Sequence, residues 1–494
     1  MNNSRWALRT AAVAVAGLAA AAGMPAMLAP AQASASHIGP ELKLVVAQRS
    51  IKVPKFGKRA YFDTGVYATA VGSPLQFDVS RAGYGKAIKI SQLIRSGGHV
   101  AFRPVPRKML DRWRGLSRFT RVTIKNSAGK IVANRVSPFC PDSYSAQRSG
   151  PNSPPSNPFP LQCAYDPFQL SNAWGLQRGW GVDTGFMVAN LAYGRYTVTV
   201  KVTAMWRRFL HMTARGSTAT EHIRVVNGRK CGYPCVAKRQ PARNGPLPEL
   251  PANVPTLSNP PTTSLPDLVP QPSRDIFVFH RGRRNHPGKD ILSFAATVWV
   301  GGHSRLDVQG FRSHGSPVMK AYQYFWKNGR IIGRARAGTM GFDNKRGHAH
   351  WHFEQFAQYR LLTADKSLMV RSRKVGFCIA PTDGVDLLLP HALWLPTYTG
   401  FGGGACGSPS ALSVQEELPL GWGDTYQQFV AGQAFDITNL PNGTYYIQII
   451  ANPEKVLHET NMSNDVSLRK IILGGTPGHR TVKVPAYHGI DPER

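Results

Sequence analysis

The sequence predicts an all-β protein with two β-sandwich-like domains joined by a proline-rich linker. Three observations predict this class. Short runs of alternating apolar and polar residues, rich in β-branched and aromatic side chains, recur along the chain. Gly, Asn and Pro separate these runs, as turn residues do. The two halves also repeat the same motifs in the same order.

Residues 1–33 have the features of a secretory signal peptide. Two arginines precede an apolar Ala/Val/Leu segment, which ends in small-residue cleavage patterns. A membrane anchor is the alternative, but Pro25 and Pro30 interrupt the segment. No later stretch is long and apolar enough to form a transmembrane segment. We therefore expect a secreted or extracellular protein, with cell-wall association left open.

Residues 34–239 are expected to form an N-terminal β-sandwich. The clearest strand runs cover 119–136 and 195–206, and "NSAG" at 126–129 predicts a turn inside the first of them. The segment "VPRKMLDRWRGL" (105–116) is compatible with a short amphipathic helix.

A second domain is expected after a linker. Residues 240–264 are dense in proline and poor in aromatics, which is typical of a semi-rigid linker. Residues 265–475 then form the second domain, with strand runs at 291–300 and 444–453, before a C-terminal tail at 476–494. Turn candidates in this domain are "KNGR" (327–330) and "LPNG" (440–443).

The two halves resemble each other in sequence. The matching pairs are "VSPFC" (136–140) with "KVGFC" (374–378), "RGWG" (178–181) with "LGWG" (420–423), and "NLAYGRYTVTV" (190–200) with "NLPNGTYYIQI" (439–449). Duplication of one module explains the shared order, and convergence on generic β patterning is the alternative. Val136 stands where the second copy has Lys374, so we expect the first copy to be a non-catalytic carrier or recognition module.

Six cysteines fit an exported chain. They are Cys140, Cys163, Cys231, Cys235, Cys378 and Cys406. An even number in this compartment predicts disulfides, and pairing of neighbours is the simplest connectivity. A four-cysteine zinc site is the alternative, which the wide scatter of the pairs disfavours.

The chain carries a large positive charge. Its 60 Lys and Arg against 27 Asp and Glu give +33. Such a surface attracts polyanions, and no nucleic-acid motif accompanies the charge. An acidic cell-envelope polymer is therefore the expected partner, with charge kept for solubility as the alternative.

The stretch "GHAHWHFEQF" (347–356) predicts a metal site. His348, His350 and His352 alternate, so on a strand they project from one face about 6.5–7 Å apart. Three imidazoles can hold one ion and leave positions open for other ligands. Nitrogen ligands suit copper or zinc, and these residues alone do not choose between the two. Zinc would imply hydrolysis with a general base, for which Glu354 is a candidate.

Several ordered motifs accompany the histidines. They are "LPDLV" (265–269), "EQFAQYRLL" (354–362), "KVGFC" (374–378), "DTYQQFVAGQAFDITNLPNGTYYIQIIANP" (424–453) and "ETNMSND" (459–465). Together with "HAHWH" they resemble the lysyl oxidases, a family of copper-dependent amine oxidases. The resemblance runs from residue 265 to about residue 473 and covers only the C-terminal half. Asp465 stands where the family usually has a second asparagine.

The resemblance implies copper held by His348, His350 and His352, and a lysyl tyrosylquinone cofactor made from the protein itself. By position, its tyrosine is Tyr426 and its lysine is Lys374. The implied reaction converts primary amines to aldehydes with release of ammonia and hydrogen peroxide. Cross-linking requires a neutral amine, which desolvation or the nearby Arg371 and Arg373 would favour.

The general base is not identified by sequence. Asp424, Glu354 and His303 are candidates. The segment from Ala380 to Glu417 departs from the animal pattern and carries the glycine run "GFGGGACG", so the substrate-access loops are expected to differ.

Other functions stay open at this point. The substrate is either protein lysines or small amines, which a strongly cationic enzyme repels at long range. A non-catalytic envelope-binding protein with a metal-stabilised, oxidase-like fold is the main alternative. A zinc hydrolase is a third, but it leaves Lys374 and the Asp-Thr-Tyr match unexplained.

Overall fold

The structure is a computed structural model of the chain. It describes residues 42–47, 50–96, 99–150, 152–163, 166–228, 254–283, 286–312, 316–343, 350–372, 374, 376–396, 406–407, 411, 413–430 and 432–493. Outside these residues lie the expected signal peptide, most of the expected linker, the glycines at 402–404, His348, Arg373, Cys231 and Cys235.

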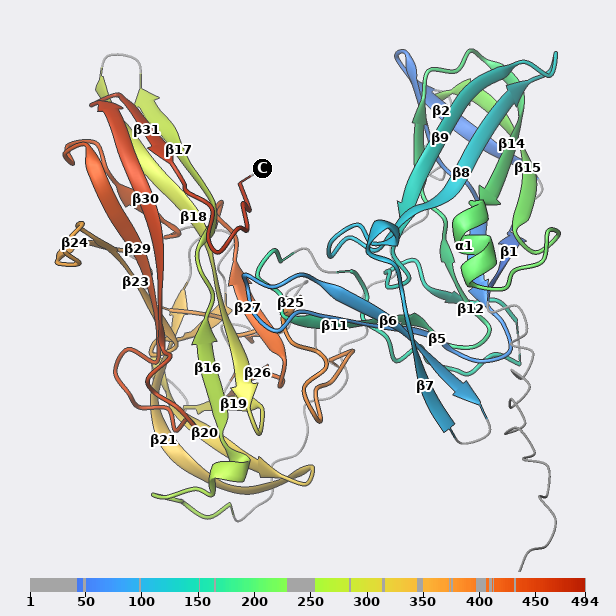
Figure 1. The fold of residues 1–494 in the computed structure, drawn as a ribbon. Helices are drawn as coiled ribbons and strands as arrows, with labels where there is room; N and C mark the ends of the chain where they lie inside the picture. Colours follow the sequence, from blue (N-terminus) through green and yellow to red (C-terminus); the bar gives the residue numbers. More distant parts are fainter. Residues whose placement is uncertain are drawn as a thin grey trace, which may run out of the picture. The chain divides into compact units, whose positions relative to one another are not determined.

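The all-β prediction is confirmed, because nearly every regular element is a strand (Figure 1). The first half contains β1 (Leu42–Val46), β2 (Ser50–Phe56), β3 (Arg59–Asp63), β4 (Val66–Ala70), β5 (Leu75–Ser80), β6 (Lys89–Ser96), β7 (His99–Pro104), β8 (Leu116–Asn126), β9 (Ile131–Phe139), β10 (Gln147–Arg148), β11 (Ser171–Leu176), β12 (Trp180–Asp183), β13 (Phe186–Ala189), β14 (Gly194–Val202), α1 (Ala204–Phe209) and β15 (Thr218–Asn227).

The second half continues in the same style. It contains β16 (Pro266–Pro270), β17 (Arg274–Arg283), β18 (His286–Gly302), β19 (Leu306–Phe311), β20 (Val318–Lys327), β21 (Arg330–Asp343), β22 (His350–Phe353), β23 (Ala357–Leu362), β24 (Leu368–Arg371), β25 (Asp383–Gly384), β26 (Ser413–Leu418), β27 (Trp422–Tyr426), β28 (Ala434–Asp436), β29 (Gly443–Ala451), β30 (Val466–Thr476) and β31 (His479–Lys483).

The sheets of the two halves have matching strand orders. β1-β4-β12-β10 in the first half corresponds to β16-β18-β27-β25 in the second. β11-β5-β6-β7 corresponds to β26-β19-β20-β21, and β9-β8-β14-β15 to β24-β23-β29-β30. The internal repeat in the sequence therefore reflects a repeated topology. Strand β22, which carries histidines, extends the second of these sheets beyond β21 and has no counterpart among the described residues beside β7.

Local details repeat as well. The hydroxyl of Tyr196 donates to the carbonyl of Ala192 at 3.0 Å, and that of Tyr445 donates to the carbonyl of Pro441 at 2.9 Å. Each tyrosine thus anchors the start of its strand, β14 or β29, to the chain four residues earlier. Such specific agreement favours duplication over convergence.

The expected hairpin turns are present. Asn126 accepts from the backbone N–H of Ala128 and Lys130 and so closes the β8–β9 turn. Asn328 and Gly329 have φ of 50° and 73° between β20 and β21, where a tight hairpin turn requires left-handed residues. These turns form because Asn and Gly tolerate that conformation.

The amphipathic segment at 105–116 does not form the α-helix considered for it. Only a 3-10 turn covers Arg107–Met109. Arg112 has a left-handed φ of 49°, which interrupts helical geometry, and Met109 and Trp113 are buried separately in the sheet core. Burial of these two side chains therefore overrides the helical period.

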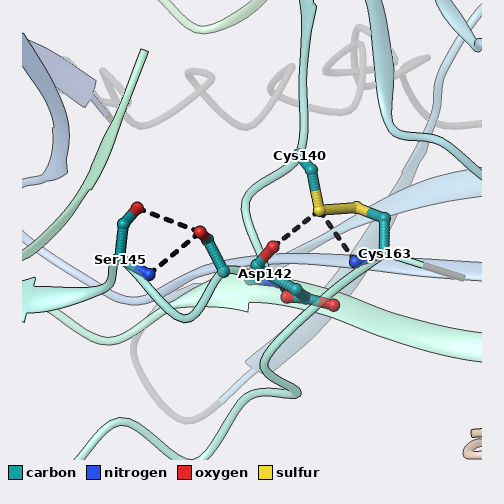
Figure 2. Close-up of a disulfide and its surroundings, with 6 residues drawn as sticks. Cys140, Asp142, Ser145 and Cys163 are labelled. Atoms are coloured by element: carbon teal, nitrogen blue, oxygen red, sulfur yellow. Dashed lines mark hydrogen bonds between the residues drawn. A yellow bond between two sulfur atoms is a disulfide. The ribbon is translucent and has the colours of Figure 1, made fainter. Parts of the chain in front are cut away.

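Two disulfides follow the predicted neighbour pairing. Cys140 bonds to Cys163, and Cys378 bonds to Cys406. Figure 2 shows the first bridge beside Asp142, whose carboxylate accepts from the backbone N–H of Gly175 in β11 at 2.7 Å. Burial raises the pKa of Asp142 well above its usual range. The third expected pair lies outside the described residues.

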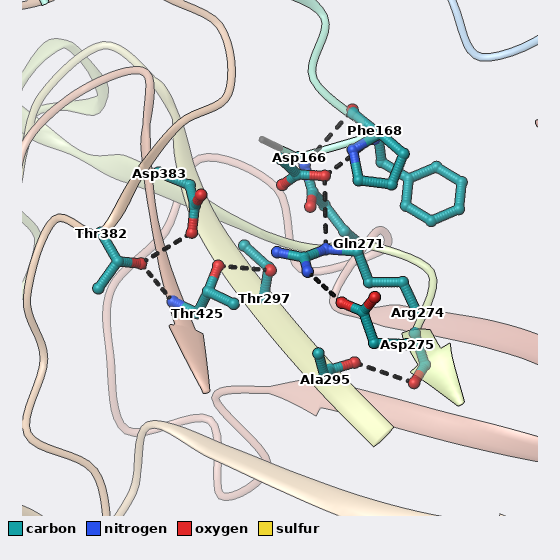
Figure 3. Close-up of polar contacts among 12 residues, drawn as sticks. Asp166, Phe168, Gln271, Arg274, Asp275, Ala295, Thr297, Thr382, Asp383 and Thr425 are labelled. Atoms are coloured by element: carbon teal, nitrogen blue, oxygen red, sulfur yellow. Dashed lines mark hydrogen bonds and ion pairs between the residues drawn. The ribbon is translucent and has the colours of Figure 1, made fainter. Parts of the chain in front are cut away.

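Each half has its own large apolar cluster. One draws on residues 42–225 and the other on residues 268–473. A buried ion pair joins a segment of the first half to one of the second, because the guanidinium of Arg274 lies 3.7 Å from the carboxylate of Asp166 (Figure 3). These two side chains are 2% and 1% exposed.

Parts of the expected linker and tail make backbone contacts. Leu257 donates to the carbonyl of Arg334 in β21 at 2.9 Å, and β31 pairs with β30. The domain boundaries expected from sequence stay a prediction. Among the described residues, no helix is long and apolar enough to cross a bilayer.

Candidate functional site

The site is built around β22, the histidine strand. This strand pairs with β21, with His350 opposite Asp343 and His352 opposite Gly341. His350 and His352 stand at alternate positions, and their ring centroids lie 4.6 Å apart with the planes at 84°. Trp351, which lies between the two histidines in the sequence, is fully buried in the core. The alternation thus places two imidazoles together on one face, as predicted.

A second segment, residues 374–378, runs beside this strand. Phe353 and Phe377 exchange two backbone hydrogen bonds, with N···O distances of 2.8 and 3.0 Å. The backbone N–H of Trp351 donates to the carbonyl of Cys406 at 2.8 Å, and the Cys378–Cys406 disulfide links that residue back to the segment. The histidine strand and the lysine-bearing segment are therefore held together by backbone bonds and a covalent bridge.

Gly376 is the point of closest approach. A Cβ placed on it would lie 2.7 Å from the Cβ and 3.4 Å from the Nδ1 of His352. The backbone at Gly376 consequently packs directly against the base of the imidazole ring.

We expect Gly376→Ala to displace His352 or the segment that carries Lys374. Overpacking of this kind typically costs about 1–3 kcal/mol of the free energy of unfolding. Chemical denaturation measures that cost, and titration of the apo-protein with Cu²⁺ measures the accompanying loss of affinity. Gly83→Ala, where a Cβ meets nothing within 4 Å, is the matched control. Equal behaviour of both variants would contradict the close packing.

Lys374 and Tyr426 come together although 51 residues separate them. The Nζ of Lys374 lies 4.1 Å from the centroid of the Tyr426 ring and 5.1 Å from that of Phe377. Lys374 is 7% exposed. Tyr426 ends β27, and Phe377 packs edge-on against its ring at 5.0 Å. The amine thus lies close to the phenol ring in a buried environment.

The phenol is fixed at its hydroxyl end. The backbone N–H of Cys378 donates to the Tyr426 hydroxyl at 2.6 Å, and that hydroxyl donates to the Cys378 carbonyl at 3.1 Å. Burial raises the pKa of Tyr426 well above its usual range, and Asp424 and Glu416 raise it further. The segment that carries Lys374 therefore also orients the tyrosine.

Two buried acids flank this pair. Burial raises the pKa of Asp424 well above its usual range, against the opposing charge of Lys374, and Asp383 raises it further. Burial likewise raises the pKa of Glu416, whose carboxylate accepts from the backbone N–H of Ile379 at 3.0 Å. Both acids thus favour their neutral forms, and Glu416 also fixes the chain just beyond the disulfide.

The other proposed bases lie elsewhere. Glu354 accepts from the hydroxyl of Thr339 at 2.7 Å and is exposed. His303 lines a separate cavity with Arg305, Trp326 and His391. Of the three base candidates from sequence, only Asp424 is next to Lys374.

The third expected ligand, His348, lies outside the described residues. Among the residues that the structure does describe, no three His, Cys, Asp or Glu side chains converge on one point. The metal-ligand set therefore stays a prediction, as do the roles of Lys374 and Tyr426.

The first half lacks the polar groups of this site. The shared motifs align each site residue with a position in the first half. Lys374 aligns with Val136 and Asp424 with Val182, while Tyr426 aligns with Thr184 and Glu416 with Trp174. Trp174 and Val182 are buried in the first core. One scaffold thus carries side chains without ionisable groups at these positions in one half and ionisable ones in the other.

Sequence reasoning missed Glu416. Its signal was a charged residue at an apolar position, since β26 alternates with Val414 and Leu418 buried on the same face. An acid on the buried side of a strand is rarely tolerated without a special environment.

Comparison with known proteins points to one family. A sequence model of the lysyl oxidase family matches residues 406–481. "Lysyl oxidase homolog 4" is 28% identical over 142 residues in Mus musculus and 30% identical over 139 residues in Homo sapiens. Each match covers 28% of this chain and 16% of the relative. "Lysyl oxidase homolog 3B" of Danio rerio is 24% identical over 177 residues, 35% of this chain and 18% of the relative.

The chain thus spans less than a fifth of the length of these relatives. A solved structure, the tetra-tandem repeat in the extending region of a large adhesion protein, has a TM-score of 0.11 and 8% identity, with 88% of this chain and 100% of that chain covered. A similarity this low carries no argument about fold. The C-terminal part of this chain is therefore similar in sequence to the lysyl oxidase family.

Proposed function

We propose that this chain is a secreted copper- and quinone-dependent amine oxidase that converts primary amines to aldehydes, with release of ammonia and hydrogen peroxide. The observation that carries the proposal is the position of the Lys374 amine, 4.1 Å from the centroid of the Tyr426 ring. The family's quinone requires one lysine and one tyrosine in contact. These two residues meet that requirement.

The donor atoms suit copper. His350 and His352 provide adjacent imidazoles from one strand face, and the sequence adds His348 two positions earlier. Nitrogen ligands of this type favour copper over harder cations. When bound, copper supplies redox chemistry toward dioxygen, and the quinone made from Tyr426 and Lys374 supplies a carbonyl that takes up electrons from an amine.

The residues of the chain prepare that chemistry. The backbone of Cys378 holds the phenol by its hydroxyl, and Phe377 limits the ring's motion from its edge. Burial raises the pKa of Asp424 well above its usual range, which favours a protonated carboxyl beside the Lys374 amine and leaves that amine without a counter-charge from this acid. A neutral amine is the form that adds to an electrophile. Asp424 is also the acid best placed to exchange a proton with an amine at this position.

The substrate is a primary amine, either a lysyl side chain or a small amine. The chain's formal charge of +33 repels free cationic amines at a distance. A polymer that the protein binds would keep its lysyl side chains nearby despite this repulsion, so lysyl side chains are favoured over small free amines as substrates.

One observation supports a non-catalytic alternative. The first half retains the scaffold while residues without ionisable groups occupy the positions of the site, so the fold does not depend on the chemistry. Under this alternative the whole chain would bind cell-envelope material without oxidising amines. A zinc hydrolase has less support, because it leaves the contact between Lys374 and Tyr426 without a role.

The test uses the purified full chain loaded with either Cu²⁺ or Zn²⁺. The copper-loaded protein is expected to give a positive redox-cycling quinone stain and peroxide release that depends on added amine. The zinc-loaded protein is expected to give neither, since zinc has no redox chemistry. Absence of the stain after copper loading in oxygenated buffer would rule out the oxidase and favour the binding protein.

A further inference from the structure

The first half contains a basic groove. Five cations line it, namely Lys108, Arg118, Arg121, Lys201 and Arg207. The rest of the lining is uncharged and consists of Val136, Val202, Thr203, Ala204 and Met205. The cavity measures about 790 Å³ and has no acidic or aromatic side chain in its wall. Its size falls within the ordinary range for ligand sites.

The groove includes one position that corresponds to the candidate site of the second half. Val136 in its wall is the counterpart of Lys374. Several other lining residues come from the end of β14 and the start of α1, which follow one another along the chain (Figure 1). In the second half the matching strand, β29, is followed by Asn452 and Pro453 and not by a helix. The features that form the groove are therefore those in which the first half differs from the second.

Cations face each other inside the groove. Arg121 on β8 is directly opposite Lys201 on β14, and its other neighbour is Val136 on β9. Like charges directly opposite on antiparallel strands destabilise a sheet. Among the described residues, none of the five cations forms an ion pair with an acid. An anion in the groove would remove this repulsion.

The backbone of the groove is also strained. Arg118 has a left-handed φ of 47°, which is unfavourable for a residue with a long side chain. Its carbonyl accepts from the Thr203 hydroxyl at 2.8 Å, and the indole N–H of Trp206 donates to the carbonyl of Ser117 at 2.7 Å. Strain that surrounding bonds maintain is typical of functional positions. Here it fixes an arginine at the mouth of a cationic cavity.

We propose that this groove binds a linear acidic polysaccharide. Several cations along one cavity suit a polymer with regularly spaced negative charges. A single-stranded nucleic acid is the weaker fit, because the wall offers no aromatic ring on which a base could stack. The proposal does not depend on amine oxidation in the second half. It assigns to the first half the role of attaching the protein to an acidic polysaccharide.

Binding is tested with the full chain and fluorescent oligogalacturonate at about 0.15 M salt. We expect saturable binding, and for the double variant Arg121→Gln/Lys201→Gln an affinity at least about tenfold lower with a shallower salt dependence. Neutral dextran oligomers should not bind. The matched control is Lys52→Gln/Arg224→Gln, a like-charged pair on the same sheet that does not line the groove.

An equal loss in both double variants would show that net charge alone attracts the polymer, and it would overturn the proposal. Tighter binding of single-stranded DNA than of oligogalacturonate, lost in the groove variant, would assign the groove to nucleic acid instead. Circular dichroism and thermal melting of each variant exclude loss of fold as the cause.

Arg118→Gly provides a second test. Glycine adopts a left-handed φ without strain, so this variant should unfold at no lower denaturant concentration than the parent protein. Its affinity for oligogalacturonate should fall severalfold, because one groove cation is removed. Unchanged affinity would exclude Arg118 from the site and contradict the proposed use of the strained backbone.

Discussion

Lys374→Arg is expected to abolish the quinone stain and to lower amine-dependent peroxide release by at least about 10³-fold. Arginine preserves most of the length of the side chain, but the guanidinium is not deprotonated in proteins and cannot add to a quinone as a neutral amine. The loss should therefore arise from chemistry, because the Lys374 amine lies 4.1 Å from the centroid of the ring with which it is proposed to form the cross-link.

Three comparisons make the result specific. Tyr426→Phe removes the hydroxyl without which the ring is not oxidised to a quinone, and it should be equally inactive, although its ring still packs against Phe377. Lys470→Arg, on the exposed side of β30, should retain full activity. Copper affinity should remain within a few-fold of the parent in the Lys374 variant, since the expected ligands are histidines. Quinone-positive Lys374→Arg protein would refute the assignment of the cofactor's lysine.

The sequence predicted the fold class well because the relevant signals are local. Alternation marks a strand half-buried in a sheet, and turns such as Asn328-Gly329 need residues that accept left-handed angles. It predicted a helix around Met109 and Trp113 less well. Their spacing suits a helical face, but each side chain is buried by strands distant in sequence, and local periodicity contains no information about such contacts.

The site was predictable only in part, for a related reason. The alternating histidines and the Lys–x–x–Phe–Cys motif are readable in one short stretch each, and family resemblance supplied Tyr426. Nothing in the sequence of β27 or β26 shows that Asp424 and Glu416 share one buried space with Lys374. That proximity arises from the pairing of β27 with β18 and from the hydrogen bonds of the chain after the Cys378 bridge. Long-range pairing of this kind is fixed by the whole fold.

Arg274→Met is expected to lower the free energy of unfolding by about 3–5 kcal/mol, the usual cost of removing one partner from a buried ion pair. The Arg274 side chain is 2% exposed, and methionine fills similar space without compensating Asp166. Lys289→Met is the control. Its bond to Asp436 is shorter, at 2.8 Å, but the side chains are 63% and 43% exposed, so the loss should be at most about 1 kcal/mol. Equal losses would show that burial does not determine the strength of these pairs.

The free energy of unfolding that Arg274→Met removes should also depend on pH. Burial raises the pKa of Asp166 from 3.8 to about 6, and Arg274 is the main influence that lowers it. A folded-state pKa above the unfolded value means that the protonated carboxyl favours folding at low pH, and this contribution is lost as pH rises through the folded pKa. Without Arg274 the folded-state pKa of Asp166 rises further. In the variant, the stability that the protonated carboxyl contributes therefore keeps falling up to a higher pH. Urea denaturation should therefore give a larger difference between variant and parent at about pH 8 than at about pH 5. A difference independent of pH would mean that the arginine acts through packing and not by compensating the buried charge of Asp166.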